Sequence, residues 1–160
     1  MPLKWGLVVT SDRVKANPLL DRITPLVEET LKARGHELVY NTITGNDPVE
    51  ILYGIASALA KGVDVVLVTG GTGPNPRDYS ADIVYKLCDR HLPGVGEEFR
   101  RRSIARGVAN AMLSRAGACG FQGRLLAVSP GNPDAAREML DLLLEIAEHA
   151  IEQLRGAKHR

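Results

Sequence analysis

Residues 65–78 read VVLVTGGTGPNPRD, an apolar and β-branched run that ends abruptly in glycines and prolines. The run predicts a buried strand, and helical sequence resumes soon after Asp78. A strand that turns through glycines into a helix is how α/β proteins place backbone N–H groups around an anion, usually a phosphate. The stretch therefore predicts an anion-binding loop at the end of a strand.

The two commonest phosphate-binding loops do not describe this stretch. No Gly-Lys-Ser or Gly-Lys-Thr sequence follows the glycines, so the loop is not a Walker A motif. Gly71 and Gly73 also lack the third glycine of the dinucleotide-binding fingerprint. The sequence of the loop therefore predicts an anion-binding site but does not identify the anion.

The rest of the chain predicts alternating strands and helices. Apolar runs indicate strands over residues 5–10, 36–44, 63–69, 118–121 and 124–129. Amphipathic spacing and capping residues indicate helices over residues 21–34, 48–62, 80–90, 97–106, 109–114 and 133–154, with a break at residues 92–94. Such repeated strand-to-helix transitions favour an α/β fold with a doubly wound, mostly parallel sheet, to which a hairpin at Gln122-Gly123 adds one antiparallel strand.

Two details of these elements are specific enough to test. Asp47 is expected to be the N-cap of the helix that Pro48 opens. The apolar residues of that helix are expected to form one buried face, made of Ile51, Leu52, Ile55 and Leu59.

The composition predicts a single soluble domain over residues 1–160. Hydrophobic residues make up 44% of the chain, charged residues 24%, and the net charge is only +1. We therefore expect no nucleic-acid partner and no membrane partner, and no apolar stretch approaches the ~20 residues of a membrane span. The first residues do not resemble a signal peptide, which favours a cytoplasmic location.

The two cysteines, Cys88 and Cys119, have no CxxC spacing. In a reduced intracellular protein we expect them to be small buried apolar side chains without a catalytic role. The four histidines are scattered without metal-ligand spacing, so a metal-histidine site is not expected. No Gly-x-Ser-x-Gly sequence indicates a serine hydrolase.

Polar residues follow four of the predicted strands, at the sheet edge where open α/β sheets bind ligands. They are Ser11-Asp12-Arg13, Asp47, the loop from Gly70 to Asp78, and Pro130-Gly131-Asn132. Backbone donors together with carboxylates suit a polyphosphate bound as its Mg²⁺ complex. The sequence therefore predicts such a site.

Structural explanations compete with this prediction. Capping alone could explain Asp47, while Asp78 could cap the next helix or pair with Arg77. Asp82 lies where a helix dipole favours an acid. Residues 100–102 and Arg106 could be a solvated basic helix face, or one of them could reach an anionic substrate.

Five segments, taken together and in order, resemble one known family. They are Ser11-Asp12-Arg13; Asp47; Thr69-Gly70-Gly71-Thr72-Gly73-Pro74 with Arg77-Asp78; Pro93-Gly94-Val95-Gly96-Glu97-Glu98-Phe99-Arg100 to Ser103; and Leu113-Ser114-Arg115 with Ser129-Pro130-Gly131-Asn132-Pro133. The chain resembles the molybdopterin adenylyltransferases, the MogA/MoaB-like family of molybdenum cofactor biosynthesis, over roughly residues 5 to 150.

The resemblance implies a three-layer α/β/α sandwich, assembled as a homotrimer or a homohexamer. It implies transfer of AMP from Mg-ATP to the terminal phosphate of molybdopterin with release of pyrophosphate, before molybdenum or tungsten is inserted with a molybdate-insertion protein. The matching catalytic residues are Asp47 and Asp78, acting through Mg²⁺.

The resemblance also implies a set of substrate-binding residues around these two aspartates. It consists of Ser11, Asp12, Arg13, Gly70, Gly71, Thr72, Gly73, Ser103, Pro130, Gly131 and Asn132. Three positions depart from the family pattern: Ser80 stands where threonine is frequent, Val95 replaces a phenylalanine, and Asp134 lies near a frequent lysine.

Two other functions stay open at this point. A non-catalytic pterin-binding or carrier protein could keep the same pocket. Related domains also occur in molybdate-insertion proteins and in competence-damage nucleotide hydrolases, although the length of the chain favours neither.

Overall fold

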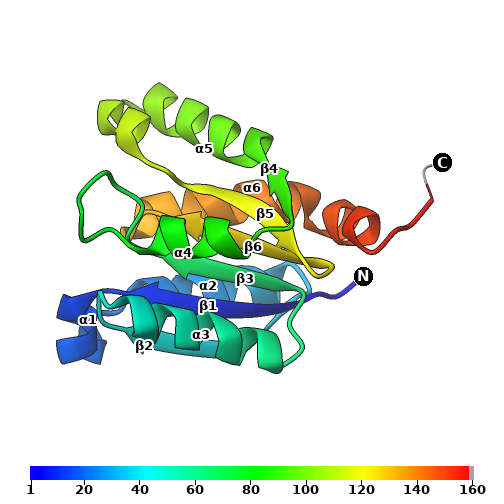
Figure 1. Cartoon of the computed structure of the whole chain (residues 1–160), viewed down its shortest axis with the longest axis horizontal. Helices are drawn as coiled ribbons and strands as arrows, with labels where there is room; N and C mark the ends of the chain where they lie inside the picture. The colour runs from blue at the N-terminus through cyan, green and yellow to red at the C-terminus, as the bar shows by residue number, and fades with distance from the viewer. Residues whose placement is uncertain (159–160) are drawn as a thin grey trace.

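A computed structural model describes residues 1–158, and within them six strands form one mixed sheet in the order β2-β1-β3-β6-β5-β4 (Figure 1). The strands are β1 (Lys4–Thr10), β2 (Glu37–Thr44), β3 (Val65–Thr69), β4 (Arg90–Leu92), β5 (Gly117–Phe121) and β6 (Arg124–Ser129). Strands β2, β1, β3 and β6 are parallel, while β5 is antiparallel to both of its neighbours. The predicted doubly wound, mostly parallel sheet with one antiparallel strand is confirmed.

Helices cover both faces of this sheet. They are α1 (Asp12–Ala16), α2 (Ile23–Ala33), α3 (Pro48–Ala60), α4 (Ser80–Leu87), α5 (Pro93–Ala105) and α6 (Pro133–Leu154), with 3₁₀ turns η1 (Pro18–Leu20) and η2 (Ala109–Leu113). One apolar core joins α2, α5 and α6 to the face that carries Leu7 and Leu67. The other joins α3 and α4 to the face that carries Val8 and Val66. Because successive residues of a strand point to opposite faces, the continuous apolar run of β3 fills both cores and makes the chain a three-layer α/β/α sandwich.

Glycines and prolines mark the helix ends where the sequence predicts them. Gly35 and Gly62 adopt the left-handed conformation after α2 and α3, with φ of 78° and 74°. Pro48 and Pro133 each occupy the first turn of a helix whose N-cap is the preceding residue. The local start and stop signals therefore act as expected from their chemistry.

Several predicted boundaries were wrong. The sequence analysis missed α1, η1 and the short edge strand β4, and it predicted a break at residues 92–94 where α5 begins instead. Pro93 is tolerated there because the first helical residue has no intrahelical acceptor for its N–H. Helix α4 ends at Leu87 and not at Arg90, since Cys88 is extended and leads into β4.

The predicted inward face of α3 was wrong at one position. Ile51, Ile55 and Ala58 are fully buried, but the Leu52 side chain is 46% exposed. Leu52, Val49 and Tyr53 lie together on the outer side of the helix, because residues three and four apart share a helix face.

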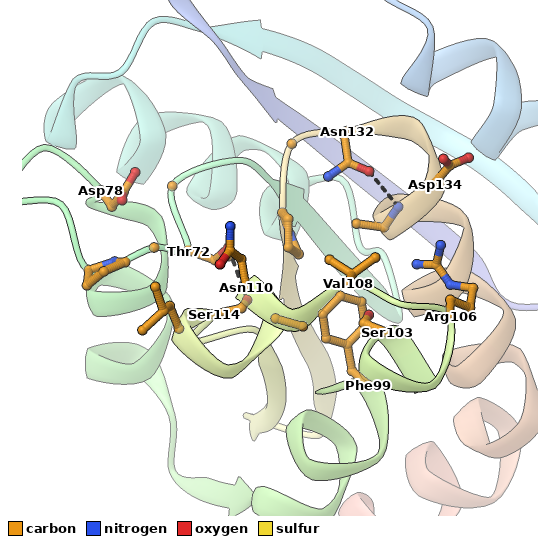
Figure 2. A pocket seen from close by; sticks show the side chains of 18 residues that line it. Thr72, Asp78, Phe99, Ser103, Arg106, Val108, Asn110, Ser114, Asn132 and Asp134 are labelled. Carbon is orange, nitrogen blue, oxygen red and sulfur yellow. Dashed lines mark hydrogen bonds between the residues drawn. The ribbon is translucent and has the colours of Figure 1, made fainter. Parts of the chain in front are cut away.

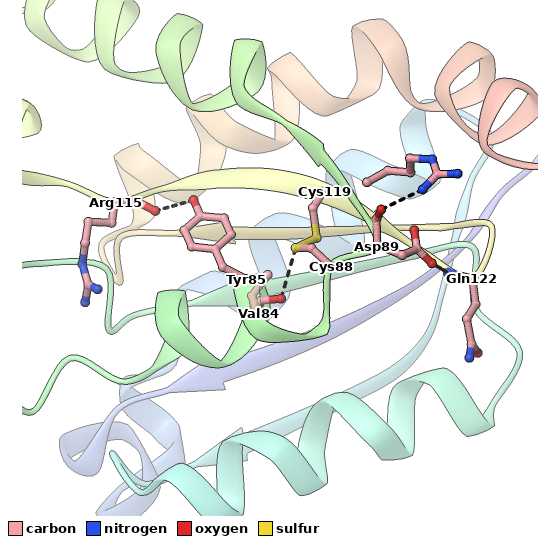
Figure 3. Close-up of a disulfide and its surroundings, with 8 residues drawn as sticks. Val84, Tyr85, Cys88, Asp89, Arg115, Cys119 and Gln122 are labelled. Carbon is pink, nitrogen blue, oxygen red and sulfur yellow. Dashed lines mark hydrogen bonds between the residues drawn. A yellow bond between two sulfur atoms is a disulfide. The ribbon is translucent and has the colours of Figure 1, made fainter.

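The prediction of two unpaired cysteines was also wrong, because Cys88 and Cys119 form a disulfide (Figure 3). Cys88 follows α4 and Cys119 lies in β5, with 5.7 Å between their Cα atoms. A cross-link across 31 residues stabilises a fold by about 3 to 4 kcal/mol in the chain-entropy account. No local spacing signals the pair, since only the packing of α4 beside β5 brings the two residues together.

The carboxyl ends of β1, β3 and β6 meet at one edge of the sheet, which we call the loop edge. Thr69 pairs with Ser129 and Val9 pairs with Thr69 in the two ladders, so the segments that follow these strands start side by side. Figure 1 shows this edge at the left of the view, with the start of the chain and the end of α6 at the opposite side.

Candidate active site

A cavity of about 540 Å³ opens at the loop edge, between the glycine loop, α5, η2 and the start of α6. Its lining consists of Gly71, Thr72, Gly73, Pro74, Asp78, Phe99, Ser103, Arg106, Val108, Asn110, Ala111, Leu113, Ser114, Pro130, Gly131, Asn132, Asp134 and Ala135. Figure 2 shows Asp78 at one end and Arg106 with Asp134 at the other. An apolar middle with polar ends suits an organic ligand that carries a charged group.

The glycines at the turn are required by space as well as by conformation. Gly70 and Gly71 have φ of 93° and 77°, which disfavour any other residue. A Cβ atom on Gly70 would lie 2.3 Å from the Thr10 carbonyl oxygen, and one on Gly71 would lie 2.6 Å from Oγ of Ser80. The loop can therefore pass this close to β1 and α4 only with glycine at both positions.

Three successive N–H groups of this loop are available to a ligand. Within residues 1–158, no protein acceptor bonds the N–H groups of Gly71, Thr72 or Gly73. The Thr72 carbonyl accepts a bond of 2.8 Å from the N–H of Arg115, and the Gly71 carbonyl accepts one of 3.2 Å from the N–H of Ala81.

The direction of these carbonyls fixes the direction of the free donors. In a trans peptide the C=O and the following N–H point in opposite directions. The N–H of Thr72 therefore points away from α4, and the N–H of Gly73 points away from Arg115. Successive N–H groups in a turn that point away from other protein groups can bind an anion together.

Asp78 closes the loop and presents a carboxylate to the cavity. Its Oδ2 atom accepts a bond of 3.1 Å from the N–H of Asn75, and the N–H of Asp78 donates to the Asn75 carbonyl at 2.8 Å. Asp78 does not cap α4, whose N-cap Tyr79 has no side-chain bond. A Cβ atom on Gly73 would lie 2.7 Å from Oδ2, so glycine at this position leaves room for the carboxylate.

A largely buried carboxylate on α6 holds two residues at the far end of the cavity. Glu138, whose side chain is 9% exposed, accepts a bond of 3.0 Å from Oγ of Ser103 and forms an ion pair with Arg106. Ser103 is only 2% exposed, and the neighbouring Glu138 carboxylate raises the pKa of Arg106. Glu138 therefore fixes both Ser103 and Arg106 in the cavity lining.

The loop after β6 lines the same cavity, as the sequence predicts for Pro130, Gly131 and Asn132. Oδ1 of Asn132 accepts a bond of 2.9 Å from the N–H of Ala135 and so caps α6 (Figure 2). A Cβ atom on Gly131 would lie 3.1 Å from Cα of Gly70. The two glycine loops are therefore in direct contact.

Asp47 lies beside this cavity and not in its lining. It caps α3, because Oδ1 accepts bonds of 2.9 and 3.0 Å from the N–H groups of Val49 and Glu50. The preceding Asn46 donates from Nδ2 to the carbonyl of Arg77 at 2.6 Å. The residues before Asp47 and Asp78 are thus bonded to each other, which joins the start of α3 to the end of the glycine loop.

The donors present fit a magnesium ion that arrives with a ligand. Asp47 and Asp78 each commit one carboxylate oxygen to backbone N–H groups, which leaves the other oxygen unbonded in the described part of the chain. Mg²⁺ typically takes one or two carboxylates together with phosphate oxygens and waters. No cluster of three or more potential ligands, counting His, Cys, Asp and Glu, occurs among residues 1–158.

The residues after β1 surround a separate, smaller space. Ser11 caps α1 by accepting a bond of 3.2 Å from the N–H of Val14, and Oδ1 of Asp12 accepts one of 2.8 Å from the N–H of Asn46. Arg13 and Ser11 line a cavity of about 150 Å³ that also reaches Gly131. Oδ2 of Asp12 also lies 4.0 Å from Nη2 of Arg77, so Asp12 contacts the residues that precede both Asp47 and Asp78.

The structure bears on two of the competing explanations. Asp82 lies in the first turn of α4, as the sequence predicts, and also pairs with Arg115, with Oδ1 at 2.7 Å from Nη1.

The basic residues of α5 and its C-cap Arg106 are not simply solvated. Arg100 donates to the carbonyls of Ser114 and Ala116, and Arg102 pairs with Glu98 and Glu145. Of residues 100–102 and Arg106, only Arg106 lines the cavity.

The substrate-binding set predicted from the sequence lacked several members of the site. Phe99 and Asn110 line the cavity, and Arg115 bonds to the carbonyls of the loop from outside the cavity. Phe99 and Arg115 lie within the segments that resemble the family, whereas no sequence signal marked Asn110. Arg106, which the sequence offered as one candidate contact to an anionic substrate, lines the cavity. None of the helices within residues 1–158 has both the length and the apolar character of a membrane span.

Comparison with known proteins identifies the family. The model of the family described as "Probable molybdopterin binding domain" matches residues 6–149. The molybdenum cofactor biosynthesis bifunctional protein of Chlorobaculum tepidum is 31% identical over 98% of this chain and 50% of its own length. The chain spans about half the length of the bifunctional curated relatives that it matches.

Two further relatives are similar over nearly their whole length. The molybdopterin adenylyltransferase of Pyrococcus furiosus is 32% identical over 95% of this chain and 91% of its own. A crystal structure of a molybdopterin biosynthesis protein from Mycobacterium abscessus has a TM-score of 0.87 and 34% identity, covering 95% of this chain and 96% of that one. The chain therefore belongs to the molybdopterin-binding domain family of molybdenum cofactor biosynthesis.

Proposed function

We propose that the chain is a molybdopterin adenylyltransferase, which transfers AMP from Mg-ATP to the terminal phosphate of molybdopterin. One observation carries the proposal: three successive unbonded N–H groups, at Gly71, Thr72 and Gly73, line a cavity that ends at the Asp78 carboxylate. Backbone donors next to a carboxylate suit a polyphosphate with its metal ion. The name of the Pyrococcus furiosus relative supports the choice of reaction.

The proposed reaction is a substitution at the α-phosphorus of ATP. An oxygen of the molybdopterin phosphate forms a bond to that phosphorus, the bond to the bridging β-phosphate oxygen breaks, and pyrophosphate leaves with the electron pair. Positioning and charge stabilisation supply most of the catalysis in such reactions. The loop N–H groups would hold phosphate oxygens, and the apolar wall with Phe99 and Val108 would hold the flat ring of the pterin.

Magnesium is part of this proposal. The unbonded oxygens of Asp47 and Asp78 would hold the ion, directly or through water, and the ion would neutralise the phosphate charge. The role of the two aspartates is then to fix where the phosphates lie. Their capping and loop bonds to backbone N–H groups keep both carboxylates in place before a ligand arrives.

We also propose that the chain assembles as a homotrimer or homohexamer and passes its product to a molybdate-insertion protein. The outer face of α3 supports an interface between copies, since Val49 and Tyr53 are 75% and 73% exposed beside Leu52. The cytoplasmic location predicted from the sequence stays a prediction.

The test is a direct assay of the purified chain with molybdopterin, Mg²⁺ and ATP. We expect adenylated molybdopterin and pyrophosphate in equal amounts. Asp78→Asn should lower the turnover about 10² to 10³-fold, because it removes a negative charge that would hold Mg²⁺ beside the phosphates. Asp141→Asn is the matched control, since Asp141 is exposed on α6 and pairs only with Arg137 at 3.5 Å.

Two outcomes would contradict the proposal. One is the absence of any ATP-dependent product, which together with pterin binding would favour the carrier function. The other is an Asp78→Asn variant that turns over at the unaltered rate.

A further inference from the structure

Arg115 makes an unusual set of contacts with the glycine loop although its side chain does not line the cavity. The guanidinium donates to the Gly73 carbonyl from Nε at 3.1 Å and from Nη2 at 2.9 Å. Nη2 also donates to the Asp78 carbonyl at 3.0 Å. One side chain therefore forms hydrogen bonds to both ends of the segment from Gly73 to Asp78.

The backbone of Arg115 is fixed from two sides. Its N–H donates to the Thr72 carbonyl at 2.8 Å, and its carbonyl accepts a bond of 2.6 Å from the Tyr85 hydroxyl (Figure 3). Burial raises the pKa of Tyr85, so the phenol keeps its proton and remains a donor. On the outer side, Oδ1 of Asp82 accepts a bond of 2.7 Å from Nη1 of Arg115 and orients the fork.

These bonds have a consequence for the catalytic carboxylate. When the Asp78 carbonyl points to Arg115, the peptide unit that follows Asp78 is held in one orientation, and the carboxylate leaves the same Cα atom. The bond from Arg115 to the Gly73 carbonyl holds the other end of the segment and keeps Gly73 beside Oδ2 of Asp78. A side chain at this position would leave no room for the carboxylate.

We propose that Arg115 is a positioning residue, which sets the place of the Asp78 carboxylate and of the loop N–H groups through the Gly73 and Asp78 carbonyls. The planar guanidinium of arginine can donate to two acceptors at once, whereas a lysine ammonium in its place is a single compact charge. The inference rests on the proposed function for its effect on rate, while its effect on the loop stands without it.

The chain contains a matched control, because Arg155 is built in the same way away from the site. Its Nε donates to the Gly123 carbonyl at 3.0 Å, and its Nη2 pairs with Asp64 at 2.7 Å. Arg155→Met should therefore lose comparable bonds without touching the loop.

The experiment compares Arg115→Met, Arg115→Lys and Arg155→Met in two measurements. Hydrogen exchange of the bonded N–H groups of Asn75, Arg77 and Asp78 in the peptides that cover residues 72–79 should become at least about tenfold faster in Arg115→Met, because the loop loses three bonds to the guanidinium. The kcat should fall about 10 to 100-fold with little change in KM for ATP, as expected when reacting groups are misplaced by about 1 Å. Arg115→Lys should recover only part of both effects, and Arg155→Met should show neither.

Unaltered exchange at residues 72–79 in Arg115→Met would overturn the inference. So would equal effects of Arg155→Met on exchange and kcat, or full recovery in Arg115→Lys, which would assign the effect to charge and not to the fork. If the unaltered chain has no turnover, the proposed function fails while the exchange measurement still decides the role of Arg115.

Discussion

Aspartate and arginine side chains occur at the loop edge and at the opposite edge of the sheet, but they have different roles at the two edges. At the loop edge, Asp78 has one oxygen bonded to the N–H of Asn75 and one unbonded in the described chain. At the opposite edge, Asp64 has both oxygens occupied: Oδ2 accepts from the N–H of Lys4 at 2.8 Å and Oδ1 pairs with Arg155 at 2.7 Å. An aspartate whose bonds are complete holds strands together, and one with a vacant oxygen can bind a ligand.

The arginines differ in the same way. Arg155 ties the end of α6 to the turn at Gly123, so its bonds close the fold. Arg115 ties a loop that lines a cavity, so its bonds leave donors and a carboxylate exposed to a ligand. The two arginines differ in their roles because their partner carbonyls belong to different segments, a turn for Arg155 and the cavity-lining loop for Arg115.

Among the substitutions that separate the two edges, Gly73→Ala at the loop edge should have the largest effect on turnover. The new Cβ atom would lie 2.7 Å from Oδ2 of Asp78, so the carboxylate must move. We expect turnover to fall about 10²-fold at nearly unaltered stability. Gly94→Ala is the control in the same assay, because a Cβ atom on Gly94 has no atom within 4 Å. Full turnover of Gly73→Ala would show that the exact place of Asp78 does not matter.

Asp64→Ala should produce the opposite pattern. The side chain is 17% exposed, and its loss leaves the N–H of Lys4 and Nη2 of Arg155 without their acceptor. The free energy of unfolding should fall by about 1 to 3 kcal/mol, measured by urea denaturation. Turnover per folded molecule should be unaltered, and a parallel loss of turnover would mean that the two edges are coupled.

The smallest expected effect is a pH dependence at the edge that Asp64 occupies. Nδ1 of His36 accepts a bond of 2.9 Å from the N–H of Leu3, and burial lowers the pKa of His36 below 6.5. Glu148 opposes this shift, while the Met1 amine and Arg34 add to it. The unfolded chain then binds the proton more readily, so stability is complete above about pH 6.5 and declines as the pH falls below it.

Thermal midpoints at pH 7.5 and pH 5.5 measure this effect. The drop between them should become smaller in His36→Gln, which does not titrate. Turnover measured well below the thermal midpoint should not follow the titration of His36. An equal drop in both proteins would assign the pH dependence to other groups.

Local chemistry made much of the fold predictable. The β-branched runs, the glycines after helices and the prolines at helix starts each act within a few residues, so the positions of most strands and helices could be predicted from the sequence alone. The same is true of Asp47, whose capping role follows from the residues beside it. The link between its neighbour Asn46 and Arg77 does not, because that bond joins residues that are 31 positions apart.

The features that escaped prediction depend on tertiary contact. Strand β4 has three residues and forms only because β5 offers an edge for pairing. The disulfide requires α4 to pack beside β5, and no spacing rule relates Cys88 to Cys119. Arg115 lies in a segment that resembles the family, but its bonds to the loop could not be predicted, since carbonyl acceptors carry no signature in a sequence.

The bonds around Arg115 link the segments that lie behind the glycine loop. The loop leads into α4, the disulfide joins Cys88 after α4 to β5, and Arg115, two residues before β5, bonds back to the loop. On the other side of the cavity, residues 107–113 have exposed side chains at Val108, Met112 and Leu113, and within the described chain their backbone N–H groups bond only to neighbouring turns. The wall formed by the glycine loop is therefore cross-linked to the sheet, whereas the backbone of the wall at η2 is held by local bonds.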